Sequence, residues 1–138
     1  DASYYLGYIA YQLEDYDAAV ENFNKVTTED GDTTVGYFQA DMNFKLGRFD
    51  KAIALARKSF ANANENQTSE LSKIIGESYF NLKDYRSALP YLEVYKGKRG
   101  KWSNTDFYQL GYTHYRLGEY EKAIMQFKQI FLIGGLSI

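Results

Sequence analysis

One ten-residue pattern occurs four times in this chain and constrains the fold more than any other feature. Each copy reads aromatic, any residue, Leu, any two residues, aromatic, any two residues, Ala, aliphatic, and the copies begin at Tyr11, Phe44, Phe80 and Tyr115. Successive copies are 33, 36 and 35 residues apart. Periods in this range are typical of arrays built from one repeated supersecondary unit. We therefore expect four copies of the same small unit, stacked along the chain.

A second repeated column indicates what that unit is. A small residue lies 12 positions before the Ala of each copy, at Gly7, Ala40, Gly76 and Gly111. Two helices approach closely where their side chains are small. Each unit is therefore predicted to be a hairpin of two helices that cross at this pair, for example at Gly111 and Ala123. In the intervening turns, Gly47 and Gly118 can end the preceding helix, and Asp15 and Asp84 can cap the following one.

This periodicity predicts eight helices and little else. A single proline in 138 residues favours helix over a turn-rich β architecture. We expect helices near 2–13, 16–27, 34–46, 49–62, 69–82, 85–96, 104–117 and 119–132, with polar loops at 27–34, 62–68 and 97–104. The repeats would span about 1–32, 33–68, 69–103 and 104–138 and form one all-α domain.

The repeated columns resemble the tetratricopeptide repeat (TPR), a helix–turn–helix unit of 34 residues. Repeat 4 resembles it most, followed by repeat 1, with Leu6-Gly7, Tyr11, Tyr16, Ala19 and Phe23. The chain departs from the family by lacking its proline at the end of the second helix. The resemblance implies a right-handed α-α superhelix. It also implies a protein-binding function without catalysis, with the first helix of each repeat lining a concave groove.

One stripe on each predicted first helix is expected to face this groove. Its residues are spaced by four and then three positions, and Tyr is favoured at protein interfaces because it combines rigid area with a hydroxyl group. The candidate partner-binding residues are Tyr4, Tyr8, Tyr11, Tyr37, Asp41, Phe44, Lys73, Glu77, Tyr108, Tyr112 and Tyr115, with Phe80 completing the stripe. Packing within the repeats is the alternative role, most of all for Tyr11, Phe44, Phe80 and Tyr115.

Several classes of function are disfavoured by composition. The formal net charge is −2, which argues against a nucleic-acid surface, and the chain has no cysteine and no apolar run long enough to span a membrane. We expect no cofactor, because no Gly-rich phosphate loop or metal-ligand cluster is present. His114, the single histidine, is expected to be a core or interface residue. Some TPR domains grip a terminal carboxylate with basic residues, but the matching positions of repeats 1 to 3 lack a basic pair.

Two further segments have alternative interpretations. Lys96, Lys98, Arg99 and Lys101 flank Trp102 and indicate either a contact for an acidic partner or a solvated loop in which the indole packs on a helix. The tail beginning at Ile130 is apolar although terminal repeats normally present a polar outer face, so self-association through this end is a further possibility.

The leading functional hypothesis is a scaffold that binds a peptide or protein segment in the groove. The alternatives are a structural spacer or homo-oligomerisation module, or a regulatory domain attached to an enzyme outside this chain. The resemblance extends to Tyr- and Asn-rich bacterial TPR proteins that act at the cell envelope. It therefore favours the periplasm or envelope over the cytoplasm, and we expect the chain to be part of a longer bacterial protein.

Overall fold

The chain forms an all-α superhelix of four helical hairpins. The computed structural model describes residues 2–26 and 33–133. The helices are α1 (Ala2–Gln12), α2 (Tyr16–Asn24), α3 (Thr33–Lys45), α4 (Phe49–Ser59), α5 (Glu65–Asn81), α6 (Tyr85–Val94), α7 (Asn104–Arg116) and α8 (Tyr120–Ile133). A 3₁₀ turn, Phe60–Asn62, follows α4, and the described residues contain no β-strand.

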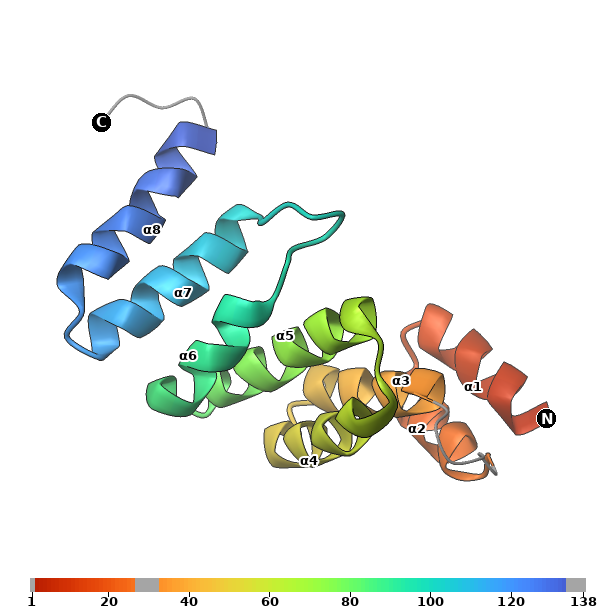
Figure 1. Cartoon of the computed structure of the whole chain (residues 1–138). Coiled ribbons are helices and arrows are strands. Elements are labelled where there is room, and N and C mark those ends of the chain that lie inside the picture. Colours follow the sequence, from red (N-terminus) through yellow and green to blue (C-terminus); the bar gives the residue numbers. More distant parts are fainter. Residues whose placement is uncertain (1, 27–32, 134–138) are drawn as a thin grey trace.

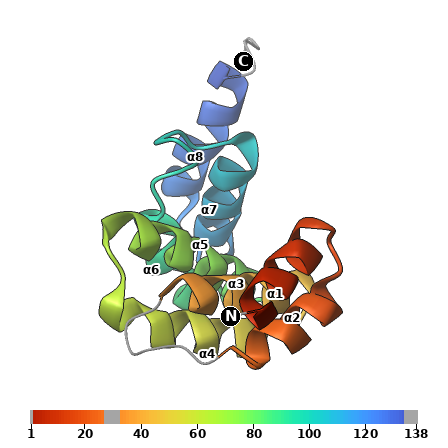
Figure 2. The same cartoon turned by 90° about the vertical axis from the view of Figure 1, so that its right-hand side faces the viewer.

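The hairpins follow one another in chain order, as Figure 1 shows from α1–α2 to α7–α8. The view turned by 90° shows α7–α8 rising above the hairpins of repeats 2 and 3 (Figure 2). Each hairpin packs on the next, and first helices of neighbouring repeats also contact one another, as in the pairs α3–α5 and α5–α7. This arrangement confirms the predicted array of stacked units.

Every hairpin turn uses the same backbone conformation at the residue after the repeated Leu. The φ angle there is +62° at Glu14, +77° at Gly47, +62° at Lys83 and +79° at Gly118. Glycine adopts this left-handed conformation without steric cost, whereas a residue with a Cβ is strained. Asp15 and Asp84 accept hydrogen bonds from backbone N–H groups three residues later, which confirms their predicted capping role.

In the three hairpins whose predicted small residue is a glycine, a large side chain of the second helix lies close to that glycine. A Cβ added to Gly111 would lie 2.9 Å from Phe127 Cε1, and one added to Gly76 would lie 2.8 Å from Leu92 Cδ2. The repeated alanines are buried four residues earlier in the second helix. The glycine thus leaves room for Phe127, one turn beyond the predicted partner Ala123, which is itself buried.

The largest core cluster joins repeats 2 and 3. It consists of fully or almost fully buried residues from α3, α4 and α5: Ala40, Ala52, Ile53, Ala56, Leu71, Ile74 and Ile75. A second cluster joins repeats 1 and 2 around Phe23 and Met42, and a smaller one joins repeats 3 and 4 around Leu92 and Leu110. The stack is thus held by three cores, one at each junction.

Four helix ends differ from prediction by two residues or more. α2 ends at Asn24 instead of residue 27, and α4 ends at Ser59 instead of residue 62, where the 3₁₀ turn follows. α5 begins at Glu65 instead of residue 69, because Asn64 and Gln67 form a capping box in which each side chain bonds the other residue's backbone N–H. α6 ends at Val94 instead of residue 96, where Tyr95 adopts an extended conformation. The predicted loop at 27–34 and the apolar end beyond residue 133 lie largely outside the described residues.

Candidate functional site

Several predicted stripe residues contact neighbouring first helices, either through another stripe residue or, for Tyr8, through Phe38, which lies outside the stripe. The ring of Tyr8 on α1 lies 5.9 Å from that of Phe38 on α3, and the ring of Phe80 on α5 lies 5.8 Å from that of Tyr112 on α7. Polar members also bridge these helices, as described below. The structure therefore brings stripe residues of α1 close to α3, and stripe residues of α5 close to α7.

The four aromatics that start the repeated pattern have a packing role within their own hairpins. Each lies edge-on against the second aromatic of the pattern, with ring centres 5.5–6.0 Å apart in the pairs Tyr11–Tyr16, Phe44–Phe49, Phe80–Tyr85 and Tyr115–Tyr120. Such pairs stabilise folded proteins by about 0.5–1.5 kcal/mol beyond the buried area. The two aromatics of the pattern thus join the two helices of each hairpin across its turn. These four ring pairs are called the hairpin clasps below.

The remaining tyrosines of repeat 1 differ in their surroundings. Tyr4 packs edge-on against Phe23 of α2, which places it in the core between repeats 1 and 2. Tyr8 contacts Phe38 with one edge and keeps 42% of its surface exposed. Of these two, Tyr8 has the greater area available for a partner.

Asp41 joins repeats 1 and 2 through a polar contact. Its Oδ2 accepts a hydrogen bond from the Tyr11 hydroxyl at 2.5 Å and lies 2.8 Å from Lys45 Nζ. Burial, together with the hydrogen bond to Asp41, raises the pKa of Tyr11 to about 12. Burial alone would lower the pKa of Lys45, but its bonds to Asp41 and Tyr11 raise it. These charges therefore satisfy one another within the fold.

Lys73 and Glu77 form a second polar contact, between repeats 3 and 4. Lys73 Nζ lies 3.7 Å from Glu77 Oε1 and 3.6 Å from Oδ1 of the buried Asp106 on α7. Gln109 Nε2 donates to Glu77 Oε2 at 3.1 Å. The ammonium group also lies 4.7 Å from the centre of the Tyr95 ring. Both predicted site residues thus have partners that fix α5 against α7.

The tyrosines of α7 form an aromatic ladder, Tyr108–Tyr112–Tyr115. Tyr108 stacks on Tyr112 with ring centres 5.9 Å apart, and Tyr112 continues to Tyr115 at 6.2 Å. Tyr108 is 48% exposed and Tyr115 is 52% exposed, whereas the half-buried Tyr112 also packs on Phe80 and Tyr85 of repeat 3. The ladder therefore has two exposed rings, Tyr108 and Tyr115, and both pack against Tyr112, whose position is fixed by repeat 3.

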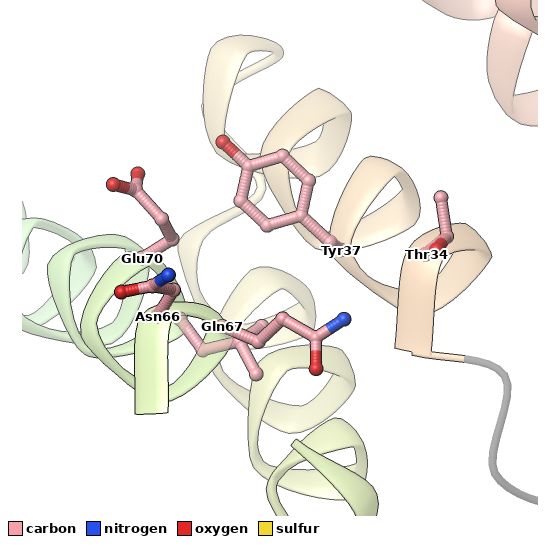
Figure 3. A pocket seen from close by; sticks show the side chains of 6 residues that line it. Thr34, Tyr37, Asn66, Gln67 and Glu70 are labelled. Atoms are coloured by element: carbon pink, nitrogen blue, oxygen red, sulfur yellow. The ribbon is translucent and has the colours of Figure 1, made fainter. Parts of the chain in front are cut away.

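A hollow opens between the beginnings of α3 and α5 (Figure 3). Its volume is about 240 Å³, and its walls are Thr34, Tyr37, Asn66, Gln67, Glu70 and Leu71. The predicted stripe contains Tyr37 but misses the α5 side of this site. The polar composition of residues 65–68 predicts a loop, and the capping-box pair Asn64 and Gln67 is the signal that places them on the helix.

Residues considered for other chemistry have structural partners. The buried His114 contacts Glu119 through Nδ1 at 3.1 Å, and this bond holds the pKa of Glu119 below its usual value. This confirms His114 as a core residue. Trp102 donates its indole N–H to the Tyr95 carbonyl at 2.7 Å and packs against Phe107 of α7, which confirms the packed-indole interpretation.

Metal-binding clusters and membrane-spanning helices are both absent from the part of the chain that the structure describes. No group of three His, Cys, Asp or Glu side chains there could hold a metal ion. None of the helices described is both long enough and apolar enough to cross a membrane.

Comparison with known proteins agrees with this architecture. The tetratricopeptide repeat model matches residues 1–33 and 107–133, which are the first and last repeats. The chain is 30% identical over 128 residues to the TPR repeat-containing protein MJ1428 of Methanocaldococcus jannaschii, covering 91% of this chain and 22% of that protein. It thus spans about a fifth of the length of this relative.

Solved structures show the same fold. A crystal structure of the MamA protein superimposes with a TM-score of 0.81 at 19% identity, covering 97% of this chain and 72% of that one. A MamA fragment from Desulfovibrio magneticus RS-1 gives a TM-score of 0.79 at 16% identity, covering 96% and 73%. With four sequence repeats, four hairpins and these similarities, the chain belongs to the tetratricopeptide repeat family.

Proposed function

We propose that this chain is a non-catalytic scaffold that binds an extended or helical segment of another protein along its first helices. The TPR fold supports a role in protein–protein interaction in general. The observation that carries the groove assignment is the row of stripe residues, which ends in open tyrosines on α1 and α7. Tyr8 and Tyr108 are its most accessible stripe members outside the hairpin clasps.

The physical basis is that a rigid aromatic ring gains apolar contact at small entropic cost, while its hydroxyl selects a polar partner. Tyr8 rests on Phe38, and Tyr108 rests on Tyr112 and Phe127. Their positions are therefore largely set before a ligand arrives, which reduces the entropy lost on binding. The segment would lie across several repeats and use apolar side chains as anchors.

A peptide-display selection tests this proposal and needs no identified partner. Random peptides are selected on the wild-type chain, and their affinities are then measured for Tyr8→Ala, Tyr108→Ala and the double variant. We expect each single change to weaken binding by about tenfold or more, the effect of losing an interface anchor. Tyr5→Ala is the matched control, because Tyr5 lies on α1 outside the stripe and is 66% exposed. Peptides that lose more affinity in the control than in the stripe variants would overturn the proposal.

A second candidate function is assembly through the two ends of the array. Exposed apolar side chains gather on α1 and the turn after it, where Ile9 is 53% and Leu13 is 74% exposed, and on α8, where Leu132 is 66% and Met125 is 63% exposed. Faces of this kind are typical of interaction sites. Light scattering over a range of concentrations tests self-association, and Leu13→Asp with Leu132→Asp should abolish any assembly that uses them. A chain that stays monomeric at all concentrations argues against this candidate.

A further inference from the structure

The hollow between α3 and α5 combines an apolar floor with a carboxylate. The ring of Tyr37 and the side chain of Leu71 provide apolar walls, and Figure 3 shows the Glu70 carboxylate and the Tyr37 hydroxyl extending on the same side of it. Its volume of about 240 Å³ is below the roughly 300–1,000 Å³ of sites for drug-sized ligands. The hollow is therefore suited to one side chain of a larger ligand.

The electrostatic surroundings of the hollow are negative. Burial raises the pKa of Tyr37, and the neighbouring charges of Asp41, Tyr11 and Glu70 add to this effect. Among the described residues, Glu70 has no lysine, arginine or histidine within ion-pair distance. The nearby cations are bound elsewhere, since Lys45 contacts Asp41 and Lys73 contacts Glu77 and Asp106. Glu70 thus has unused capacity to accept hydrogen bonds from a cation.

We propose that this hollow binds a lysine or arginine side chain of the partner segment. The aliphatic stem of such a residue would pack between Tyr37 and Leu71, and its charged end would reach Glu70. Long basic side chains commonly bury their stems along apolar surface while the charged group stays at the rim. The assignment rests on the proposed groove function and adds the chemistry of one anchor position.

Four peptide mixtures test this assignment. They share random flanking positions and differ at one central residue, which is lysine, arginine, norleucine or glutamate. Titration into the ¹⁵N-labelled chain should shift the amide signals of residues 34–37 and 66–71 with the lysine and arginine mixtures. The norleucine mixture retains the stem without the charge, so we expect its affinity to be about tenfold lower, the loss of one hydrogen-bonded charge. The glutamate mixture should bind more weakly still.

Glu70→Gln keeps the size of the side chain and should remove the preference for lysine over norleucine. Glu93→Gln is the control, because Glu93 is an exposed glutamate on α6, away from the hollow, and it should keep the preference. Equal binding of the lysine and norleucine mixtures, or a preference that survives in Glu70→Gln, would overturn this assignment and leave the groove function standing. Failure of all four mixtures to bind would overturn the groove function as well.

Discussion

The junction between repeats 1 and 2 has a cation of its following first helix above aromatic rings, whereas the junction between repeats 2 and 3 has its cation on a second helix. Lys45 Nζ lies 4.8 Å from the ring centre of Tyr11 and 5.3 Å from that of Tyr16. Between repeats 3 and 4, Arg116 at the matching position lies 5.1 Å from the ring centre of Tyr85. Between repeats 2 and 3 this position is Asn81, which bonds a carbonyl of its own helix. The cation–aromatic contact of this junction comes instead from Arg57 on α4, which lies 5.5 Å from the ring centre of Tyr79 on α5.

The middle junction depends on its core instead. The aliphatic cluster around Ile75 is fully buried there, and the hollow beside Tyr37 opens above it. The difference teaches that the opening in the first-helix surface coincides with the junction that lacks a cation–aromatic contact at this first-helix position. The outer junctions have this contact on the first-helix surface, and the middle junction has the largest buried aliphatic cluster.

Removing a core side chain from the middle junction should have the largest effect on stability. Ile75→Ala deletes a side chain that is 0% exposed and should reduce the free energy of unfolding by about 2–5 kcal/mol. Ile124→Ala is the control, because Ile124 is 53% exposed and should change stability by less than about 0.5 kcal/mol. Urea denaturation followed by circular dichroism measures both, and equal losses would contradict the assigned core.

Opening the first junction should have the next largest effect. Asp41 is 9% exposed, and Asp41→Ala leaves the Tyr11 hydroxyl and the Lys45 ammonium group without their shared acceptor, at a cost of about 1–3 kcal/mol. Lys45→Met should cost less, because Tyr11 and Asp41 keep their hydrogen bond. A double-mutant cycle of the two changes, measured by urea denaturation, should show that they are coupled. Strictly additive losses would mean that Asp41 and Lys45 act independently.

The same junction should weaken at alkaline pH. The pKa of Tyr11 is raised to about 12 in the folded chain, whereas an unfolded tyrosine ionises near about 10. The contribution of neutral Tyr11 to the free energy of unfolding is therefore fully present below the pKa of the unfolded chain, and it is lost as the pH rises through the pKa of the folded chain. The raised pKa of Tyr37 acts in the same direction. In Tyr11→Phe the decline in the free energy of unfolding across this alkaline range should be shallower than in the wild type. Parallel curves for the two proteins would contradict this account.

Adding a cation at this first-helix position of the middle junction should have the smallest effect. Asn81→Arg would place a guanidinium group near the Phe44–Phe49 pair, as Arg116 lies near Tyr85, and should stabilise the fold by about 0.5–1 kcal/mol. Gln12→Arg is the matched control, because Gln12 is the same position in repeat 1, where this chain supplies no preceding repeat. Thermal melting should show a gain for the first variant and none for the second. A larger gain in melting temperature for Gln12→Arg than for Asn81→Arg would contradict the comparison between the junctions.

Much of this fold could be predicted from the sequence because the packing columns recur at the same positions in every unit. The four hairpins, their turns and the small residue at each helix crossing all follow from Leu, aromatic, Ala and Gly at invariant spacing. The pattern does not identify the large side chain beside each glycine, because a column shows which residues are equivalent without showing which ones touch. Phe127 and Leu92 are visible as apolar residues, but their distance to a glycine depends on how the two helices rotate about each other.

The candidate site could be predicted only in part, since it depends on where the repeats differ. Spacing identifies the stripe positions, and the structure shows that Asp41, Lys73 and Glu77 contact neighbouring repeats. No single-repeat pattern contains such cross-repeat pairs. The hollow does not follow from the repeats because it forms where two helix beginnings meet, and one of them, at Glu65, has the polar composition of a loop.

Hydrogen exchange on a complex with a selected peptide tests the central claim most directly. If the first helices form the partner surface, backbone amides in α1, α3, α5 and α7 should exchange more slowly in the complex, with the second helices α2, α4 and α6 little changed. The strongest effects are expected in the turns of α1 and α7 that carry Tyr8 and Tyr108. Protection confined to α8 or to the second helices would contradict a first-helix groove.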